Sequence, residues 1–339
     1  MIGQLVMLQP GGAGRKWWLS VLLAILILGF WGAWRGMPGI EYWRTAWRPE
    51  TALGAAAMAV CFVSALLLRG LRWKFLQERH CGSDRGEWLA VYGAVFALAA
   101  MTPMRAGEIA RIAWLKSRGV SLSYGAGALI LERLQDLVCM VLLLLAGFAL
   151  MPGLSNWIGI STLLLAAMVI VMYVVLSSCA LRIPRSLPKR CRSFWNETPR
   201  VKWRMARFWV GLGVLRTKRL YLSVTALGIA VWLLHALSFS LFFFAWDPNL
   251  PFFTGTMVLV IVNLGGVLHL TPGNIGPYEF IGSLVLERLG MNSGEAMVAM
   301  VLLHASTLFV VAGYGMLCWL VLYRRGGVRN RMDHGIPAA

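Results

Sequence analysis

Long apolar runs separated by short polar or basic segments make up most of this chain. Six of them approach or exceed the roughly 20 residues that an α-helix needs to cross the apolar core of a bilayer. These runs are Trp17 to Trp34, Ala52 to Leu68, Ser123 to Met151, Trp157 to Ser178, Leu220 to Trp246 and Ala296 to Tyr323. The pattern predicts an all-α fold, a polytopic membrane helical bundle with about six full spans.

Two further apolar runs, Trp88 to Met101 and Phe252 to Leu270, are shorter and end in helix-breaking sequences, TPMRAGE and TPGNIGPYE. Hydrocarbon offers no water to free backbone groups or charges, so such breaks persist only where they line a protein-enclosed cavity. We therefore predict two re-entrant helical hairpins whose tips form the working site. The residues that shape these tips are Pro103, Gly107, Pro272, Gly273, Gly276 and Pro277.

Basic residues gather between the apolar runs, most densely from Arg182 to Arg219. Cytoplasmic loops of membrane proteins carry such an excess of positive charge. The pattern therefore places this segment and both chain ends in the cytoplasm. By the same argument the basic residues Arg69, Arg72, Lys74, Arg79 and Arg85 belong to a cytoplasmic loop that follows the second span. The first hairpin then enters the membrane from the cytoplasm and the second from outside.

The sequence indicates one integral membrane domain over residues 1–339. Its expected parts are two N-terminal spans (1–87), a first hairpin repeat (88–178), a basic cytoplasmic loop (179–219), a second hairpin repeat (220–323) and a cytoplasmic tail (324–339). Glu108 to Gly119 has the same length as Glu279 to Gly290, and Arg133 and His304 follow the two glutamates at equal offsets. Two copies of opposite orientation form an inverted repeat, the arrangement found in many secondary transporters.

Composition excludes a soluble domain, because 59% of the residues are hydrophobic, 14% are charged and the mean hydropathy is +0.69. A net charge of +18 would suggest nucleic acid as the partner of a soluble protein. Here the charges flank predicted spans, so we expect them to contact anionic lipid head groups instead. The cysteine spacings match no metal or redox motif, and we expect no cofactor and no metal site.

Ionisable residues within the apolar runs are the main chemical candidates, because charge at membrane depth needs a partner or water. The sequence LERLQD places Glu132 and Asp136 on one helix face, with Arg133 beside them. A guanidinium in a cavity can bind phosphate through two hydrogen bonds, which makes Arg105 and Arg111 candidate head-group ligands. Alternatively, Arg133 forms a structural ion pair with Glu108 or Glu279, or the charged residues gate a cavity or carry protons. The candidate transport residues are Arg105, Glu108, Arg111, Glu132, Arg133, Asp136, Asn274, Tyr278, Glu279 and His304, with no catalytic residue among them.

Three ordered motifs, TPMRAGEIAR, LERLQD and LTPGNIGPYEF, resemble the transmembrane domain of the lysylphosphatidylglycerol synthase family, a flippase-like family of membrane proteins. The resemblance implies a helical bundle with re-entrant hairpins that moves lipids between leaflets. Longer members carry a soluble synthase domain that this chain is expected to lack, so we expect no aminoacylation of lipid. Stand-alone relatives are associated with polyprenyl-linked, hopanoid or other glycolipids. His304 departs from the arginine usual there, which weakens the expected symmetry of the charged residues.

The leading hypothesis is a lipid flippase or transporter of the bacterial inner membrane that moves a phosphate-bearing phospholipid, polyprenyl lipid or glycolipid and has no enzymatic activity. One alternative is a membrane-embedded lipid-phosphate transferase with Glu108 or Asp136 as base. Another is a non-transporting scaffold that recruits a separate lipid-modifying enzyme. The sequence leaves open the lipid, the direction of movement, the energy source and the oligomeric state.

Overall fold

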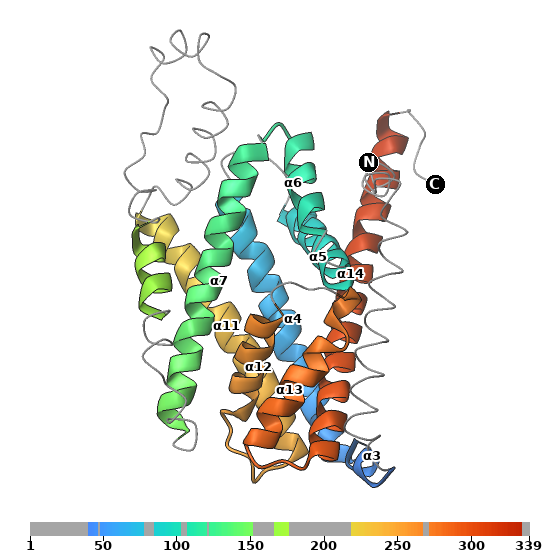
Figure 1. Cartoon of the computed structure of the whole chain (residues 1–339). Helices are drawn as coiled ribbons and strands as arrows, with labels where there is room; N and C mark the ends of the chain where they lie inside the picture. Colours follow the sequence, from blue (N-terminus) through green and yellow to red (C-terminus); the bar gives the residue numbers. More distant parts are fainter. Residues whose placement is uncertain are drawn as a thin grey trace. The chain divides into compact units, whose positions relative to one another are not determined.

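The computed structural model describes residues 40–46, 48–77, 85–102, 107–120, 122–151, 166–175, 218–266 and 271–333 (Figure 1). Every regular element in these ranges is helical, which confirms the predicted all-α class. Three of the described helices, Pro49–Gln77, Arg219–Trp246 and Ser293–Arg325, are long and apolar enough to cross a membrane. The six full spans and the inverted repeat remain predictions, and the first expected span lies outside the described residues.

The helices follow the apolar runs closely. They are α3 (Ile40–Ala46), α4 (Pro49–Gln77), α5 (Arg85–Met101), α6 (Gly107–Ser117), α7 (Leu122–Leu150), the helix Ala166–Val175, α11 (Lys218–Trp246), α12 (Thr254–Gly265), the 3-10 helix η4 (Pro272–Asn274), α13 (Pro277–Arg288) and α14 (Ser293–Asp333). Two helix ends differ clearly from the prediction, because α4 continues beyond Leu68 to Gln77 and α14 continues beyond Tyr323 to Asp333. The expectation that Arg69 and Arg72 lie in a loop is therefore wrong, and both are buried within this helix.

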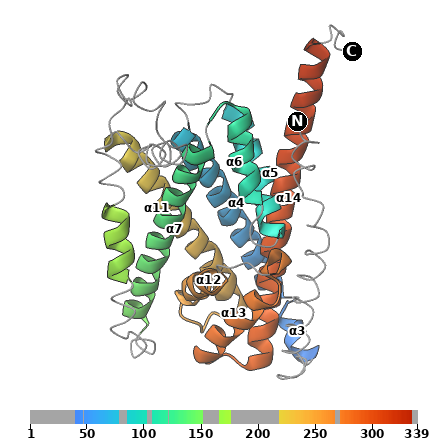
Figure 2. The same ribbon diagram turned by 45° about the horizontal axis from the view of Figure 1, so that its top comes forward.

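Contacts divide the chain into two compact units. The first consists of Met1–Leu67, Asp84–Ala110 and Leu234–Ala339, and the second of Leu68–Ser83 and Arg111–Leu233. In the first unit, α14 packs along α5 and against α13, which in turn contacts α12 (Figure 2). Exposed apolar side chains such as Phe309 on α14, which is 81% accessible, are typical of a surface that faces lipid.

The second unit has an apolar core to which α4, α7, α11 and the helix Ala166–Val175 contribute. One cluster joins Leu76, Leu131, Leu134, Tyr173 and Val224, and a neighbouring cluster joins Val141, Ala166 and Val169. Leu131 and Leu134 flank the charged residues of the LERLQD motif on α7. The same helices that form this core therefore hold the charges of that motif.

The segments after Glu108 and after Glu279 have the same local structure. Helices α6 and α13 both end before a glycine with positive φ, 82° at Gly119 and 96° at Gly290. Each helix end is closed by the same two backbone hydrogen bonds, from Gly119 and Val120 in the first copy and from Gly290 and Met291 in the second. The long helices α7 and α14 then begin at equal offsets from the two glutamates. The repeat predicted from sequence thus extends to helix bounds and turn geometry within each copy.

Helix α6 begins where its backbone lies directly against that of α5. A Cβ atom at Gly107 would lie 2.6 Å from the Cα of Ala99 and 2.8 Å from the carbonyl oxygen of Val95. We expect Gly107→Ala to lower the unfolding temperature of the purified protein, because overpacking of this kind costs about 1–3 kcal/mol. Gly313→Ala on α14 is the control, since a Cβ there meets no atom within 4 Å. Equal unfolding temperatures for the two variants would contradict this close approach.

Candidate functional site

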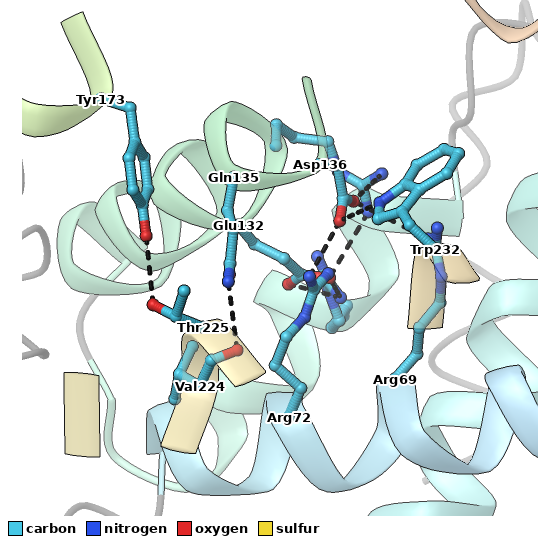
Figure 3. A network of polar contacts seen from close by, with 11 residues as sticks. Arg69, Arg72, Glu132, Gln135, Asp136, Tyr173, Val224, Thr225 and Trp232 are labelled. Atoms are coloured by element: carbon cyan, nitrogen blue, oxygen red, sulfur yellow. Dashed lines mark hydrogen bonds and ion pairs between the residues drawn. The ribbon is translucent and has the colours of Figure 1, made fainter. Parts of the chain in front are cut away.

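A group of six ionisable side chains lies inside the second unit, and we call it the ion cluster (Figure 3). Its members are Arg69 and Arg72 from α4, Arg111 from α6, and Glu132, Arg133 and Asp136 from α7. Glu132 and Asp136 lie on one face of α7, as predicted from their four-residue spacing. Both are buried, so α7 depends on neighbouring helices to supply the opposite charge.

Arg72 is the centre of the ion cluster. Its Nη1 donates a hydrogen bond of 2.8 Å to Oδ1 of Asp136, and its Nη2 donates one of 3.1 Å to Oε1 of Glu132. The side chain has no solvent exposure. A guanidinium presents several N–H groups in a planar fork, so it can bind two carboxylates at once where an ammonium would favour one. Arg72 therefore joins α4 to α7 through both acidic residues.

The other arginines surround the same two carboxylates. Arg111 approaches Glu132 at 3.2 Å, Arg69 approaches Asp136 at 3.7 Å, and Arg133 lies 3.4 Å from Asp136. Trp232 on α11 donates a further hydrogen bond of 3.0 Å from its indole N–H to Asp136. Each carboxylate thus has several donors, as a buried charge requires. Arg133 is the least enclosed member, with 30% of its side chain exposed.

The ion cluster carries more positive than negative charge. Its described members are four guanidinium groups and two carboxylates, which gives a net charge of +2. The sequence of the second unit has the same bias, with twenty lysines and arginines against four aspartates and glutamates. Guanidinium groups therefore outnumber carboxylates among the described members of the ion cluster.

Tryptophan rings and a narrow crevice border the ion cluster. The guanidinium of Arg69 lies 5.3 Å from the ring centroid of Trp232, and that of Arg111 lies 5.7 Å from that of Trp73. Such rings favour a cation through their π electrons. The crevice is lined in part by Trp73, Gln77, Arg111 and Glu132, and it is too narrow to admit a water molecule. A head group would reach the arginines only after this crevice widens.

The backbone of α11 lies close to two polar side chains of the neighbouring helices, Arg72 on α4 and Gln135 on α7. The Nε2 of Gln135 donates a hydrogen bond of 3.1 Å to the carbonyl oxygen of Val224. A Cβ atom at Gly228 would lie 3.1 Å from Nη1 of Arg72 and even closer to Gln135. The absence of a side chain at Gly228 therefore lets α11 approach both polar groups.

The first unit contains a different polar site at the second hairpin. Glu279 on α13 accepts a hydrogen bond of 2.7 Å from the backbone N–H of Gly276, and its other oxygen lies 2.7 Å from Nδ1 of His304 on α14. The ring of Tyr278 stacks on that of His304 at a centroid distance of 4.0 Å. Glu279 and His304 are both buried. The Glu279–His304 pair therefore joins the hairpin to the long helix that follows it.

The second tip is folded tightly between α12 and α13. Gly273, Asn274 and Gly276 have positive φ values of 63°, 59° and 97°. The hydroxyl of Thr271 donates a hydrogen bond of 2.8 Å to the carbonyl oxygen of Ile275. Pro277 occupies the first turn of α13, a position where a proline lacks no needed hydrogen bond. The predicted interruption by proline and glycine is thus present at this tip.

The structure brings several of the predicted residues together and leaves others apart. Arg111, Glu132, Arg133 and Asp136 meet in the ion cluster, whereas Asn274, Tyr278, Glu279 and His304 lie at or near the second tip, where Pro272 begins η4. Glu108 and Gly107 lie in the first turn of α6. Pro103 and Arg105 fall outside the described residues. Within its own unit Arg133 contacts Glu132 and Asp136, and Glu279 contacts His304, while the alternative of an Arg133 ion pair with Glu108 or Glu279 stays a prediction.

Sequence reasoning did not identify Arg69, Arg72 or Trp232 as part of a site. The available signal was the position of Arg69 and Arg72 at a three-residue spacing in the apolar sequence LLLRGLRW, which places them on one helix face. Nothing in the sequence distinguished Trp232 from any other tryptophan in an apolar helix.

Comparison with known proteins supplies a family relationship. A profile of the family described as the lysylphosphatidylglycerol synthase TM region matches residues 17–315 of this chain. The chain is also similar to a protein described as a UPF0104 membrane protein from Methanothermobacter thermautotrophicus. The two share 26% identity over 272 residues, which cover 77% of this chain and 79% of that protein. No solved structure matches the chain. The range matched by the profile contains both hairpin sequences and the whole ion cluster.

The ion cluster predicts strong energetic coupling between α4 and α7. We expect Arg72→Met to lower the free energy of unfolding by about 3–5 kcal/mol, because it removes the shared partner of two buried carboxylates. Adding Asp136→Asn should cost less in this background than in the wild type, with a coupling energy of about 1–3 kcal/mol. Denaturant unfolding of the four proteins in detergent measures that coupling.

Arg118→Met is the control for loss of an arginine, since Arg118 is partly exposed beside Trp114 and lies outside the ion cluster. Its effect should stay below about 1 kcal/mol. Strictly additive effects of Arg72→Met and Asp136→Asn would contradict the described contact.

Proposed function

This chain belongs to the family of the lysylphosphatidylglycerol synthase transmembrane region, and we propose that it moves a phosphate-bearing lipid between membrane leaflets. The family match confirms the resemblance carried by the three sequence motifs. A membrane protein of this family fits a role that involves lipids. Leaflet exchange itself, the absence of enzymatic activity and the location in the bacterial inner membrane belong to the proposal.

One observation carries the proposal, namely a group of four arginines gathered around two buried carboxylates inside the second unit. Ionisable side chains inside a membrane protein usually mark the path of a polar substrate or ion. Arginine binds phosphate with two parallel hydrogen bonds, and its weaker hydration makes this contact favourable away from water. In this proposal the phosphate of a lipid head group accepts hydrogen bonds from these arginines, while its acyl or prenyl tails stay in the bilayer.

The members of the ion cluster have distinct roles in this proposal. Arg72 holds Glu132 and Asp136 in place, and these carboxylates orient the remaining guanidinium groups before a head group arrives. Arg111 and Arg133 are the direct phosphate ligands, because Arg111 lines the crevice and Arg133 is partly exposed. An incoming phosphate competes with the two carboxylates for these N–H groups. Release on the far side restores the original ion pairs, so the site can act repeatedly.

The second hairpin has a gating role in this scheme. In the repeat register His304 takes the position of Arg133, and its partner Glu279 anchors the start of α13 through the backbone of Gly276. Breaking this contact would free the start of α13 from α14. The Glu279–His304 pair therefore suits an element that must open and close.

Leaflet exchange of fluorescent phosphatidylglycerol and phosphatidic acid in reconstituted vesicles tests the proposal. Wild-type protein should accelerate exchange over protein-free vesicles. Arg111→Gln and Arg105→Ala should each slow it about ten-fold or more, since a hydrogen bond to a charged group contributes about 1.5–3 kcal/mol. Arg111→Lys keeps the charge but loses the planar fork, and it should give an intermediate rate.

Arg118→Gln is the matched control, because it removes a surface arginine from the same region of the chain and should keep the wild-type rate. Unfolding temperatures of all variants separate loss of activity from loss of structure. Folded Arg111→Gln protein with an unchanged rate would rule out this assignment. A chemically altered lipid after incubation would indicate a transferase instead.

A further inference from the structure

A buried glutamine at the end of α4 adds a neutral polar group to the crevice beside Arg111. Gln77 lines this crevice, only 1% of its surface is exposed, and its Oε1 atom has no hydrogen-bond partner among the described residues. We infer that Gln77 is a specificity-determining residue, whose side-chain amide binds a hydroxyl of the lipid head group while the phosphate binds Arg111. This inference rests on the proposed function and names the class of its substrate, a phosphate-bearing lipid with a hydroxyl in its head group.

The burial of this amide oxygen calls for a physical reason. Most buried polar atoms of side chains in proteins have a hydrogen-bond partner, because leaving one unpaired is unfavourable. The crevice around Gln77 is too narrow to admit a water molecule, so water has no room to pair with the amide there. A leucine of similar size would fill the same place without this cost. A ligand group that enters when the crevice widens would give the glutamine its partner.

Three helices form the crevice, and their spacing relates Gln77 to the charged residues. Trp73 and Gln77 lie one turn apart on α4, and Arg111 lies opposite on α6. The guanidinium of Arg111 is 5.7 Å from the ring centroid of Trp73. One helical turn, about 5 Å, therefore separates the amide from the residue that contacts Arg111. A hydroxyl a few bonds beyond a phosphate on Arg111 can span this distance.

Apolar side chains form most of the remaining wall of the crevice. They are Leu76, Ile112, Leu115, Ala128 and Leu129. Gln77 is the single amide among the described residues that line it. A hydroxyl that enters such a site needs a hydrogen-bond partner. An amide offers both a donor and an acceptor, as a hydroxyl does, so the two can pair in either orientation of the amide. A head group without a hydroxyl would leave the amide unpaired.

Phosphatidylglycerol and phosphatidylethanol are a matched pair of lipids for the test. Both are phosphodiesters with the same charge, and glycerol carries the hydroxyl groups that the ethyl group lacks. Each lipid is labelled on an acyl chain, and its leaflet exchange is measured with the full-length chain in vesicles after subtraction of the rate in protein-free vesicles. Wild-type protein should move phosphatidylglycerol about ten-fold faster than phosphatidylethanol, because only the first lipid satisfies the amide.

Gln77→Leu removes the amide and keeps a side chain of similar size, so it should bring the ratio of the two rates close to one. Gln135→Leu is the matched control, because it removes a buried amide of the same unit that already has a partner, the carbonyl oxygen of Val224. This control should keep the wild-type ratio. The rise in unfolding temperature when each lipid is added in detergent gives a second readout, which measures binding without transport.

Stability of the two variants without added lipid tests the unpaired state of the amide. Gln77→Leu should keep or raise the unfolding temperature, since it removes a polar atom that has no partner among the described residues. Gln135→Leu should lower it, since a hydrogen bond of 3.1 Å is lost. An equal fall for both variants, or failure of Gln77→Leu to fold, would show that the amide of Gln77 has a structural partner and would overturn the inference.

The remaining outcomes separate this inference from the proposed function. Equal exchange of the two lipids by wild-type protein, or an unchanged ratio in folded Gln77→Leu, would overturn the inference and leave leaflet exchange intact. Stronger stabilisation by phosphatidylglycerol than by phosphatidylethanol, lost in Gln77→Leu and without any exchange, would support the inference and refute transport. The absence of both exchange and stabilisation with either lipid would refute both.

Discussion

Arg72 must stay paired with Glu132 and Asp136, because a charge that loses its partner in an apolar interior is strongly unfavourable. This constraint holds the end of α4 against the middle of α7 and fixes the face that α7 turns inward. Apolar packing around Leu76, Leu131 and Leu134 then follows from the same alignment. The ion pairs therefore specify which helix faces meet, while the apolar contacts supply most of the packing.

We propose that the arginines gathered around Glu132 and Asp136 make this structural contact a binding site as well. The Glu279–His304 pair joins α13 to α14 in a different way, through one carboxylate and one imidazole. The segments after Glu108 and Glu279 thus share the geometry of their helix ends and their terminal glycines but differ in their ionisable residues. We attribute head-group binding to the first copy and conformational control to the second. The enclosed crevice beside Arg111 implies that binding requires a change of conformation.

The helices were predicted well from the sequence, because the length of an apolar run and the positions of helix-breaking residues are local properties of the chain. The starts of α7 and α11, the turn at the second tip and the parallel between Gly119 and Gly290 all followed from such patterns. The end of α4 did not follow from such a pattern, because an arginine after an apolar run looks like the boundary of a membrane span. Whether Arg72 lies in water or in protein depends on acidic residues 60 and 64 positions away, which no local pattern reveals.

The candidate site was predicted in part for the same reason. Four of the six ionisable residues of the ion cluster were recognised, namely three on α7, where charge interrupts an apolar helix, and Arg111 on α6. Their partners Arg69 and Trp232 were missed, because an arginine near a basic segment and a tryptophan in a membrane helix are both ordinary. The pairing of Glu279 with His304 likewise depends on the distance between two helices, which sequence offsets alone leave undetermined.

Identification of the lipids that co-purify with the protein tests the central claim most directly, namely that the ion cluster binds a lipid phosphate. Mass spectrometry of wild-type protein should find a phosphate-bearing lipid enriched over the surrounding membrane extract. The enrichment should disappear in Arg111→Gln and persist in Arg118→Gln. A bound-lipid profile identical to the bulk membrane in all three proteins would contradict the account.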